Sequence, residues 1–277
     1  MTQALTAGIE LTDPQFSSIS RLVKGMAGIN LHDGKRMLVK ARLNKRLRAL
    51  GMRSFDQYVD RLRADVDGSE TRAMLDALSP NLTFFFREPR HFQLLAEHVV
   101  PAMLERHRTD RRLRLWSAGC SSGEEPYSIA MTLRKAIPDA AFWDIGILAT
   151  DISTRVLQVA ARGVYGSERL RKVHSEHVRE NFHGEDTGGY RVKESLRRMV
   201  TFARLNLMDA WPMRGKFDTI FCRNVMIYFD KPTQEALVDR FWNQLAPGGV
   251  LFVGHSESLA GIRHRFEHVQ PTMYQRR

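Results

Sequence analysis

The chain is poor in cysteine and has no long hydrophobic stretch. Its two cysteines, Cys120 and Cys222, are 102 positions apart and provide neither a disulfide framework nor the spacing of a metal site. No apolar run approaches the ~20 residues of a transmembrane helix, and the first residues lack the pattern of a secretory signal peptide. We therefore expect a cytoplasmic protein that binds no metal and is not inserted in a membrane.

Acidic residues are absent from one segment of this basic chain. Residues 34–53 hold eight Lys or Arg and no Asp or Glu, whereas the charges are mixed elsewhere and the net charge is +11. This uneven distribution favours one local patch for an anionic partner. By charge alone, that partner is a nucleic acid, an anionic membrane surface or an acidic protein face.

The order of apolar and polar segments predicts two kinds of structure. The N-terminal part reads as short helices, and the helix at 35–50 has an apolar stripe that begins at Val39 and ends at Leu50. Helices and strands then alternate, which is typical of a doubly wound α/β sheet. The expected parts are a helical domain at 1–80, a linker at 81–90, and an α/β domain at 91–277 with a small hairpin excursion at about 165–200.

The most informative segment joins an apolar strand to a helix through a loop of small residues. The strand at 113–118 is followed by Gly119 and Gly123, and then by Glu124 and Glu125 in the first helical turn. In parallel sheets such a loop builds a nucleotide-sized site at the carboxyl ends of the strands. Two acidic residues in place of a phosphate-binding Lys favour a cationic, hydroxyl-rich ligand such as S-adenosylmethionine, although both also suit a helix N-terminus.

Polar residues end the next two apparent strands. Asp151 stands where a carboxylate can hold both ribose hydroxyls of a nucleoside. Its alternative role is to cap the following helix, a role that Ser153 could also take. Asn206 and Leu207 suit the edge and face of an adenine, although Asn also commonly ends strands in turns.

A buried strand at 217–222 delivers a polar pair at its carboxyl end, where the transferable methyl group is expected. The pair is Arg223 and Asn224, and Tyr228 follows four residues after Asn224. Burial of the strand explains its apolar residues but not these polar ones. The segment before the α/β domain adds three further candidates for ligand contact: Asn81, Thr83 and Arg87.

These segments resemble the chemotaxis receptor methyltransferases of the CheR type over nearly the whole chain. The matching segments are, in order, 81–88, 117–128, 221–229 and 254–257. The resemblance implies a helical N-terminal domain and a Rossmann-like methyltransferase domain with a small inserted antiparallel β subdomain. It implies S-adenosyl-L-methionine as cofactor and S-adenosyl-L-homocysteine as product, with contacts from Asn81, Thr83, Arg87, Glu124, Glu125, Asp151, Asn206, Leu207, Arg223 and Asn224. Which of the two glutamates makes the main contact stays open.

The resemblance also implies methyl transfer to glutamate side chains of chemotaxis receptors, which forms γ-glutamyl methyl esters for sensory adaptation. Arg87 and Tyr228 match positions that bear on the reaction itself. Lys35, Arg42 and Arg46 fall on one side of the basic helix and are expected to dock on the acidic methylation helices of a receptor, the alternative being a solvated basic face. We expect a monomer that is recruited to membrane receptor arrays and binds no nucleic acid.

The chain departs from the family pattern in two places. Ser79 and Pro80 stand where Thr residues are usual, and the loop between Phe182 and Arg191 is shorter than in enteric members. In some members the inserted subdomain docks on a pentapeptide at the receptor's C-terminus. The short loop leaves it undecided whether this chain docks in that way. His255 is expected to be structural.

Two other functions were weighed against receptor methylation. A nucleic-acid methyltransferase fits the basic patch. However, the segment after residue 222 lacks the Asn/Asp-Pro-Pro-aromatic element that grips an exocyclic amino group. The other alternative is a non-catalytic module that binds S-adenosylmethionine or a receptor. Loss of Glu124, Glu125, Asp151 or Asn224 would have favoured such a module, but all four residues are present.

Overall fold

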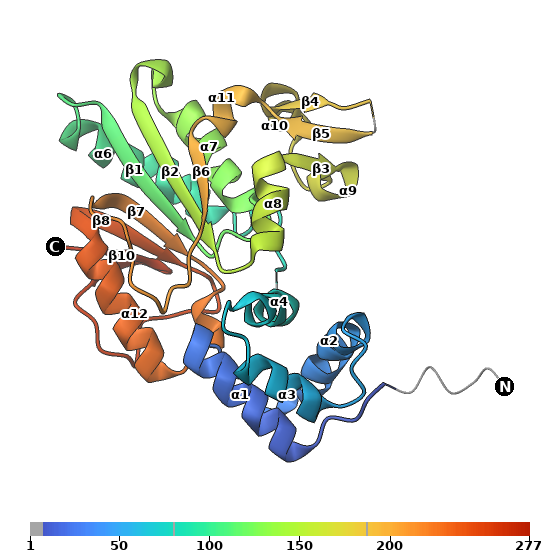
Figure 1. Cartoon of the computed structure of the whole chain (residues 1–277). Coiled ribbons are helices and arrows are strands. Elements are labelled where there is room, and N and C mark those ends of the chain that lie inside the picture. Colours follow the sequence, from blue (N-terminus) through green and yellow to red (C-terminus); the bar gives the residue numbers. More distant parts are fainter. Residues whose placement is uncertain (1–7, 80, 187) are drawn as a thin grey trace. The chain divides into compact units, whose positions relative to one another are not determined.

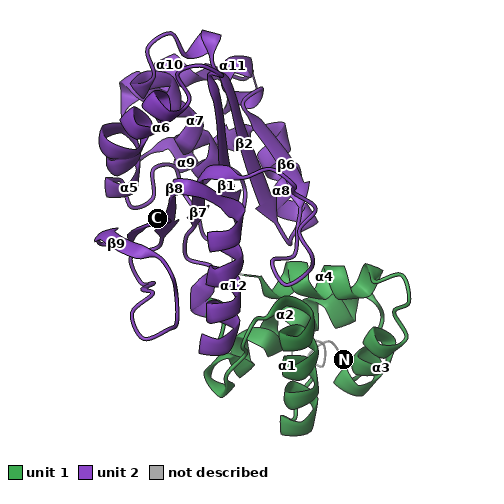
Figure 2. Cartoon of the chain, turned by 90° about the vertical axis from the view of Figure 1, so that its left-hand side faces the viewer, with its two compact units in different colours: residues 1–80, 228–230 green, residues 81–227, 231–277 purple. Residues whose placement is uncertain are grey.

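The structure, a computed structural model, describes residues 8–79, 81–186 and 188–277 (Figure 1). The chain forms two compact units, which Figure 2 shows in different colours. The helical unit comprises residues 1–80 and 228–230, and the sheet unit comprises residues 81–227 and 231–277. The short segment 228–230 therefore belongs to the helical unit, although both of its sequence neighbours belong to the sheet unit.

Four α-helices form most of the helical unit. α1 ends at Ala27 and is capped by Gly28, whose φ of 71° is a left-handed conformation that glycine adopts without a steric penalty. The next residue, Ile29, makes an isolated antiparallel bridge with Phe229 of the returning segment. The helices of this unit are α1 (Asp13–Ala27), the short 3-10 helix η1 (Asp33–Lys35), α2 (Arg36–Ala49), α3 (Phe55–Arg63) and α4 (Ser69–Leu78).

α2 is the expected basic helix, and its apolar stripe is buried except at its last residue. Val39, Leu43 and Leu47 are at most 1% exposed, whereas Leu50 lies just beyond the helix and is half-buried. The 3.6-residue period of the helix thus places the stripe in the core of this unit.

A buried ion pair joins three of these helices. Glu70 of α4 is 2% exposed, and it accepts hydrogen bonds from Nε and Nη2 of Arg46 at 2.7 and 2.5 Å. The hydroxyl of Tyr58, from α3, donates to the same carboxylate at 2.9 Å. Burial, followed by the bond to Glu70, raises the pKa of Tyr58 well above its ordinary value. A charged group at the centre of the unit is thus fully paired, as a buried carboxylate requires.

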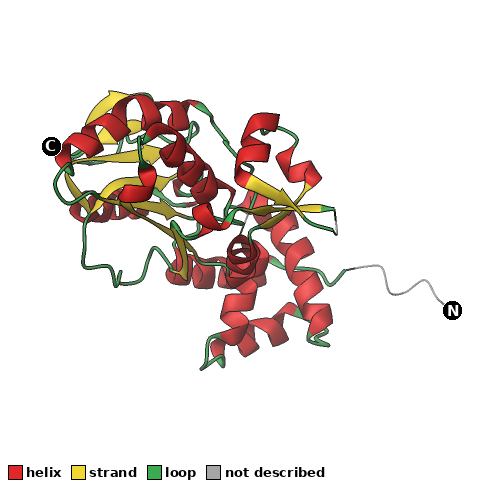
Figure 3. Ribbon diagram, turned by 90° about the horizontal axis from the view of Figure 1, so that it is seen from above, coloured by secondary structure: helices red, strands yellow, loops and turns green. Residues whose placement is uncertain are grey.

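A seven-stranded sheet forms the centre of the sheet unit, with helices on both of its faces (Figure 3). The strand order is β6-β2-β1-β7-β8-β10-β9. The first five strands are parallel, and β10 pairs antiparallel with both of its neighbours, β8 and β9. The strands are β1 (Arg112–Ala118), β2 (Asp144–Asp151), β6 (Val200–Arg204), β7 (Phe217–Cys222), β8 (Leu245–Val253), β9 (Glu267–Gln270) and β10 (Met273–Gln275). The parallel part confirms the α/β fold class, whereas β9 and β10 were not predicted.

The helices of the sheet unit connect these strands. They are α5 (Arg90–Leu94), the π-helical turn η2 (Leu95–Val99), α6 (Val100–Arg106), α7 (Glu124–Ala136), the 3-10 helix η3 (Ala140–Phe142), α8 (Thr154–Arg162), the 3-10 helix η4 (Met226–Tyr228) and α12 (Lys231–Gln244). α7 begins at Glu124, so that Glu124 and Glu125 lie in its first turn as expected. None of the helices in the described ranges is both long and apolar enough to cross a membrane.

The interruption expected at about 165–200 is a small antiparallel subdomain. Its strand order is β3-β5-β4, and Phe85 packs edge-on against Tyr165 and Phe182 of its outer strands. The resemblance implied this sheet, but its short helices were not predicted. Its elements are β3 (Val164–Gly166), α9 (Ser167–Leu170), α10 (Ser175–Asn181), β4 (Phe182–Gly184), β5 (Gly189–Val192) and α11 (Glu194–Arg197).

Candidate active site

The predicted ligand residues of the sheet unit gather where β1, β2 and β7 end. β1 lies between β2 and β7, so that their carboxyl ends share one edge of the sheet. The loop after β1 needs its two glycines, Gly119 at φ 83° and Gly123 at φ 96°. A Cβ atom on Gly119 would lie 2.4 Å from Cγ2 of Val225, and one on Gly123 would lie 2.8 Å from the Tyr165 hydroxyl. Close approach of two other segments therefore fixes this loop.

A chain of charges crosses the edge of the sheet. Arg223, whose side chain is 1% exposed, donates through Nη1 to Glu125 at 3.0 Å and through Nη2 to Glu88 at 3.0 Å. Ser117, in β1, donates to the other oxygen of Glu125 at 2.7 Å. Burial raises the pKa of Glu125, and the pull of Arg223 offsets this effect only in part. Burial also acts to raise the pKa of Glu88, but Arg223 and Asn224 lower it overall.

Backbone geometry holds Asn224 at the end of β7. Its φ is 59°, and its side-chain amide donates to Glu88 at 3.2 Å. The carboxylate of Glu257 accepts four backbone N–H bonds, from Asn224 (2.7 Å), Gly254 (2.6 Å), Val225 (2.9 Å) and Ile227 (3.2 Å). A left-handed asparagine is tolerated there because this carboxylate binds its own N–H and those of the residues that follow it.

The two adjacent glutamates have different partners. Glu124 is fully buried and accepts hydrogen bonds from Ser122 and from Arg169 of α9, both at 2.7 Å. Glu125 instead pairs with Arg223. Glu124 thus links the loop after β1 to the inserted subdomain, and Glu125 links it to β7.

Asp151 serves the loop after β1, and Ser153 is the helix cap. Asp151 accepts backbone N–H bonds from Ser121 and Ser153, each at 2.9 Å. The hydroxyl of Ser153 accepts from Val156, in the first turn of α8, so the cap falls to Ser153. Asn206 forms a local turn, in which it accepts from the backbone of Met208 and donates to Asp209. The neighbouring Leu207 is 8% exposed.

The segment 81–88 lies against the same loop. The carbonyl of Asn81 accepts a hydrogen bond from the Ser121 hydroxyl at 3.1 Å. The Asn81 side-chain nitrogen is buried and has no hydrogen-bond partner in the part of the chain that the structure describes. Arg87 folds back on its own segment and donates to the carbonyl of Leu82 at 2.8 Å, while Thr83 is half-buried. A buried amide without a partner is typical of a position that a ligand satisfies.

Tyr228 and the predicted docking residues belong to the helical unit. The Nζ of Lys35 lies 5.5 Å from the ring centre of Tyr228, whose carbonyl accepts from the Asn30 N–H at 2.7 Å. Arg42 donates to the carbonyl of Leu78 at 2.7 Å, and Arg46 pairs with Glu70 as described above. All three basic side chains therefore also have contacts within the protein. The exposed residues of α2 are others, namely Met37, Leu38, Ala41, Lys45, Arg48 and Ala49.

Sequence reasoning missed several residues of this site. Glu88 and Glu257 each end a segment that matched the family, which is the only signal that either offered. Arg169 gave no signal, because its contact with Glu124 spans 45 positions. Ser117 offered no signal beyond its place in the strand, and Ser121 suited only a cap of the following helix, whose N-cap is Gly123.

Comparison with known proteins adds an independent line of support. Residues 14–79 match the family model "CheR methyltransferase, all-alpha domain", and residues 81–275 match "CheR methyltransferase, SAM binding domain". The chain is 42% identical to the chemotaxis protein methyltransferase of Escherichia coli K12, over 98% of this chain and 93% of that protein. It is also 42% identical to a probable chemotaxis protein methyltransferase of Rhizobium etli, over 90% of this chain and 94% of that protein. The chemotaxis protein methyltransferase 2 of Pseudomonas aeruginosa is 43% identical, over 95% and 93%.

Proposed function

The chain belongs to the CheR methyltransferase family, and on this premise we propose that it methylates glutamate side chains of chemotaxis receptors. It is an S-adenosylmethionine-dependent methyltransferase of chemotaxis, as its two family domains and its curated relatives establish. The finer proposal is that the product is a γ-glutamyl methyl ester on a receptor helix. This proposal rests on the presence of both family domains in the chain. The chain also matches a chemotaxis protein methyltransferase almost from end to end.

The residues at the edge of the sheet suit S-adenosylmethionine. This cofactor carries positive charge and two ribose hydroxyls, and the edge of the sheet offers four carboxylates. Glu88 and Glu125 pair with Arg223, and Glu124 pairs with Arg169. Asp151 binds the backbone of the loop after β1. The unpartnered amide of Asn81 supplies a buried donor. We propose that the cofactor is held by Asn81, Thr83, Arg87, Glu124, Glu125, Asp151, Asn206, Leu207, Arg223 and Asn224, and that S-adenosyl-L-homocysteine leaves as product.

The reaction needs little acid or base chemistry from the protein. S-adenosylmethionine supplies a methyl group on a sulfonium, and a substrate glutamate with a pKa of about 4.3 is already ionised at neutral pH. The protein therefore acts by excluding water and by orienting the carboxylate. We propose that Arg87 orients it with a charge-assisted hydrogen bond and that Tyr228 positions it through its hydroxyl.

The test is incubation of the full chain with methyl-tritiated S-adenosylmethionine and membranes that contain candidate receptors, with nucleic acid in parallel. Alkali-labile label on a receptor band supports the proposal, because carboxyl methyl esters hydrolyse in alkali. Glu125→Gln should abolish the label, whereas Glu105→Gln, a change to a side chain that is 78% exposed, should leave it. Label on nucleic acid would favour a nucleic-acid methyltransferase. Cofactor binding without label on any receptor would favour a non-catalytic module.

Receptor docking is proposed for basic residues of α2 and for Lys35, which ends η1 directly before α2. Lys35, Arg42 and Arg46 would steer the enzyme to acidic methylation helices and thereby recruit it to receptor arrays. Arg42→Glu should lower receptor methylation and its dependence on salt while leaving the affinity for S-adenosylmethionine unchanged. The matched control is Arg108→Glu, which makes the same charge change on a side chain that is 74% exposed. Equal methylation by the two variants would contradict docking through Arg42.

A further inference from the structure

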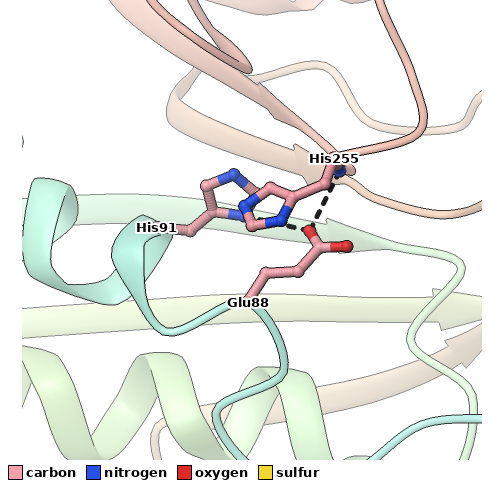
Figure 4. A group of neighbouring side chains, drawn as sticks. All are labelled: Glu88, His91 and His255. Carbon is pink, nitrogen blue, oxygen red and sulfur yellow. Dashed lines mark hydrogen bonds and ion pairs between the residues drawn. The ribbon is translucent and has the colours of Figure 1, made fainter.

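Three potential metal ligands meet beside the charge chain of the sheet unit. Glu88 precedes α5, His91 lies within α5, and His255 follows β8 (Figure 4). One ligand atom from each side chain lies within 4.8 Å of the other two, and in the described ranges this is the one group of its kind. The function proposed above uses neither histidine.

Hydrogen-bond accounting identifies the ring nitrogen of His91 that is available. Both the Nε2 of His91 and the carbonyl of Pro271 lie within hydrogen-bond distance of the Thr272 hydroxyl. We assign the hydroxyl proton to the bond with the carbonyl, which makes Nε2 of His91 the donor to Thr272. Nε2 therefore carries the proton of the neutral imidazole, and Nδ1 is left with a lone pair. Nδ1 is buried and has no hydrogen-bond partner in the part of the chain that the structure describes.

That lone pair faces a negatively charged atom. Nδ1 of His91, whose side chain is 0% exposed, lies 3.5 Å from Oε2 of Glu88. Two acceptors at this distance repel each other unless a cation lies between them. Glu88 (φ 57°) and Thr272 (φ 66°), the two neighbours of the His91 ring, both have a left-handed backbone. The fold therefore holds these two residues beside His91 at a cost in backbone strain.

The charges around the group favour a divalent cation. Arg223 is the guanidinium that contacts Glu88, and it is shared with Glu125. Glu257 adds a third carboxylate, bound to the loop that leads into His255. Arg223 thus pairs with two carboxylates, Glu88 and Glu125, which leaves this group of charges net negative.

We propose that Glu88, His91 and His255 form a site for a divalent transition-metal ion, for which Zn²⁺ is the appropriate probe. Two imidazole nitrogens and one carboxylate oxygen are a ligand set that binds zinc and leaves a fourth position for water. Thr272 holds the ring of His91, the role that hydrogen-bonded neighbours of metal ligands commonly play.

Metal binding would compete with the anchoring of the cofactor residues. Oε2 of Glu88 accepts from Arg223 at 3.0 Å, and Oε1 accepts from Asn224 at 3.2 Å. Zinc that takes this carboxylate weakens both contacts, and it therefore inhibits methyl transfer. This second step rests on the function proposed above, whereas zinc binding itself does not.

The binding test uses the full chain after removal of metals by a chelator. Zn²⁺ is titrated against a chromophoric competitor, and thermal unfolding is followed with and without the metal. We expect one Zn²⁺ per chain and a higher melting temperature with zinc. His255→Ala should bind at least about 100-fold more weakly and lose the thermal shift, because it lacks a direct ligand.

A matched variant separates this site from unspecific binding to surface histidines. His264 is also exposed and lies in the same C-terminal part of the chain, so His264→Ala should bind zinc like the unchanged protein. Equal zinc affinity in the two variants, or no saturable binding at one ion per chain, would overturn the proposal. A lack of saturable binding would mean that a proton, rather than a metal ion, lies on Nδ1 of His91.

The inhibition arm repeats the receptor methylation assay over a series of zinc concentrations. Inhibition should follow occupancy of the site in the unchanged protein and in His264→Ala, and shift to at least about 100-fold higher zinc in His255→Ala. Inhibition at the same zinc concentration in all three would contradict the regulatory step. Zinc binding that depends on His255, in a protein that methylates no receptor, would instead contradict the proposed function alone.

Discussion

Glu257 should contribute more to the active-site loop than its single charge suggests. It is 6% exposed, and each of its oxygens accepts two backbone N–H bonds. Glu257→Gln replaces one oxygen by an amino group, which cannot accept and faces two donors. Each buried donor left without a partner costs about 1–3 kcal/mol, so we expect a loss of about 2–6 kcal/mol in the free energy of unfolding.

The glutamine variant is informative because it is nearly isosteric. Glu257→Ala loses all four acceptors but opens space in which water can bond to the freed N–H groups. We therefore expect both variants to be destabilised to a similar extent. Because Asn224 depends on this carboxylate, affinity for S-adenosylmethionine should fall by about tenfold or more, equivalent to about 1.4 kcal/mol.

Urea unfolding followed by circular dichroism and calorimetric titration with S-adenosylmethionine measure the two effects. The matched control is Glu105→Gln on the exposed surface, which should stay within about 0.5 kcal/mol of the unchanged protein. If Glu257→Gln also stays within about 0.5 kcal/mol and binds the cofactor normally, the four hydrogen bonds do not hold the loop and the reasoning fails.

Three further predictions concern other parts of the chain. Arg87→Ala should lower turnover by about 100-fold with a much smaller loss of cofactor affinity, measured by steady-state kinetics and calorimetry; equal losses would make Arg87 only a cofactor contact. Arg46→Ala should cost the helical unit about 3–5 kcal/mol in urea unfolding, because it leaves the charge of Glu70 buried. Arg46→Met with Glu70→Met and Tyr58→Phe should recover most of it, because the third change removes the hydroxyl that would otherwise lose its acceptor. A triple variant no more stable than Arg46→Ala would contradict this. Burial raises the pKa of Tyr127 to about 12. Stability should therefore fall as the pH rises from about 10 to 12, where the unfolded chain loses this proton first, and Tyr127→Phe should remove about 2 kcal/mol of that fall in urea titrations.

The features that could be predicted from the sequence are set by neighbouring residues. A strand, a glycine loop and a helix start follow one another between residues 113 and 125, and the buried stripe of α2 follows from its helical period. Both depend on local backbone geometry, which a pattern of residue types reports directly. The positions of Glu124 and Glu125 in the first turn of α7 were correct for this reason.

The pairing of charged groups could not be predicted in the same way. Arg223 bonds to groups 98 and 135 positions away, and Arg46 bonds to Glu70 at a distance of 24 positions. Spacing along one helix identified the side on which Arg46 lies, but not that its partner comes from α4. The strands β9 and β10 were missed because they are three or four residues long and contain His, Gln and Glu.

The return of residues 228–230 to the helical unit has a consequence for dissecting the enzyme. A shortened chain that starts at residue 81 would keep Phe229, which is 9% exposed in the whole protein, and would lose the Ile29 strand bridge beside it. The truncated protein would thus expose an aromatic ring directly after the loop that Glu257 holds. The N-terminal part is therefore not a detachable module. Deletions and domain exchanges should keep or replace residues 8–79 and 228–230 together, as one structural unit.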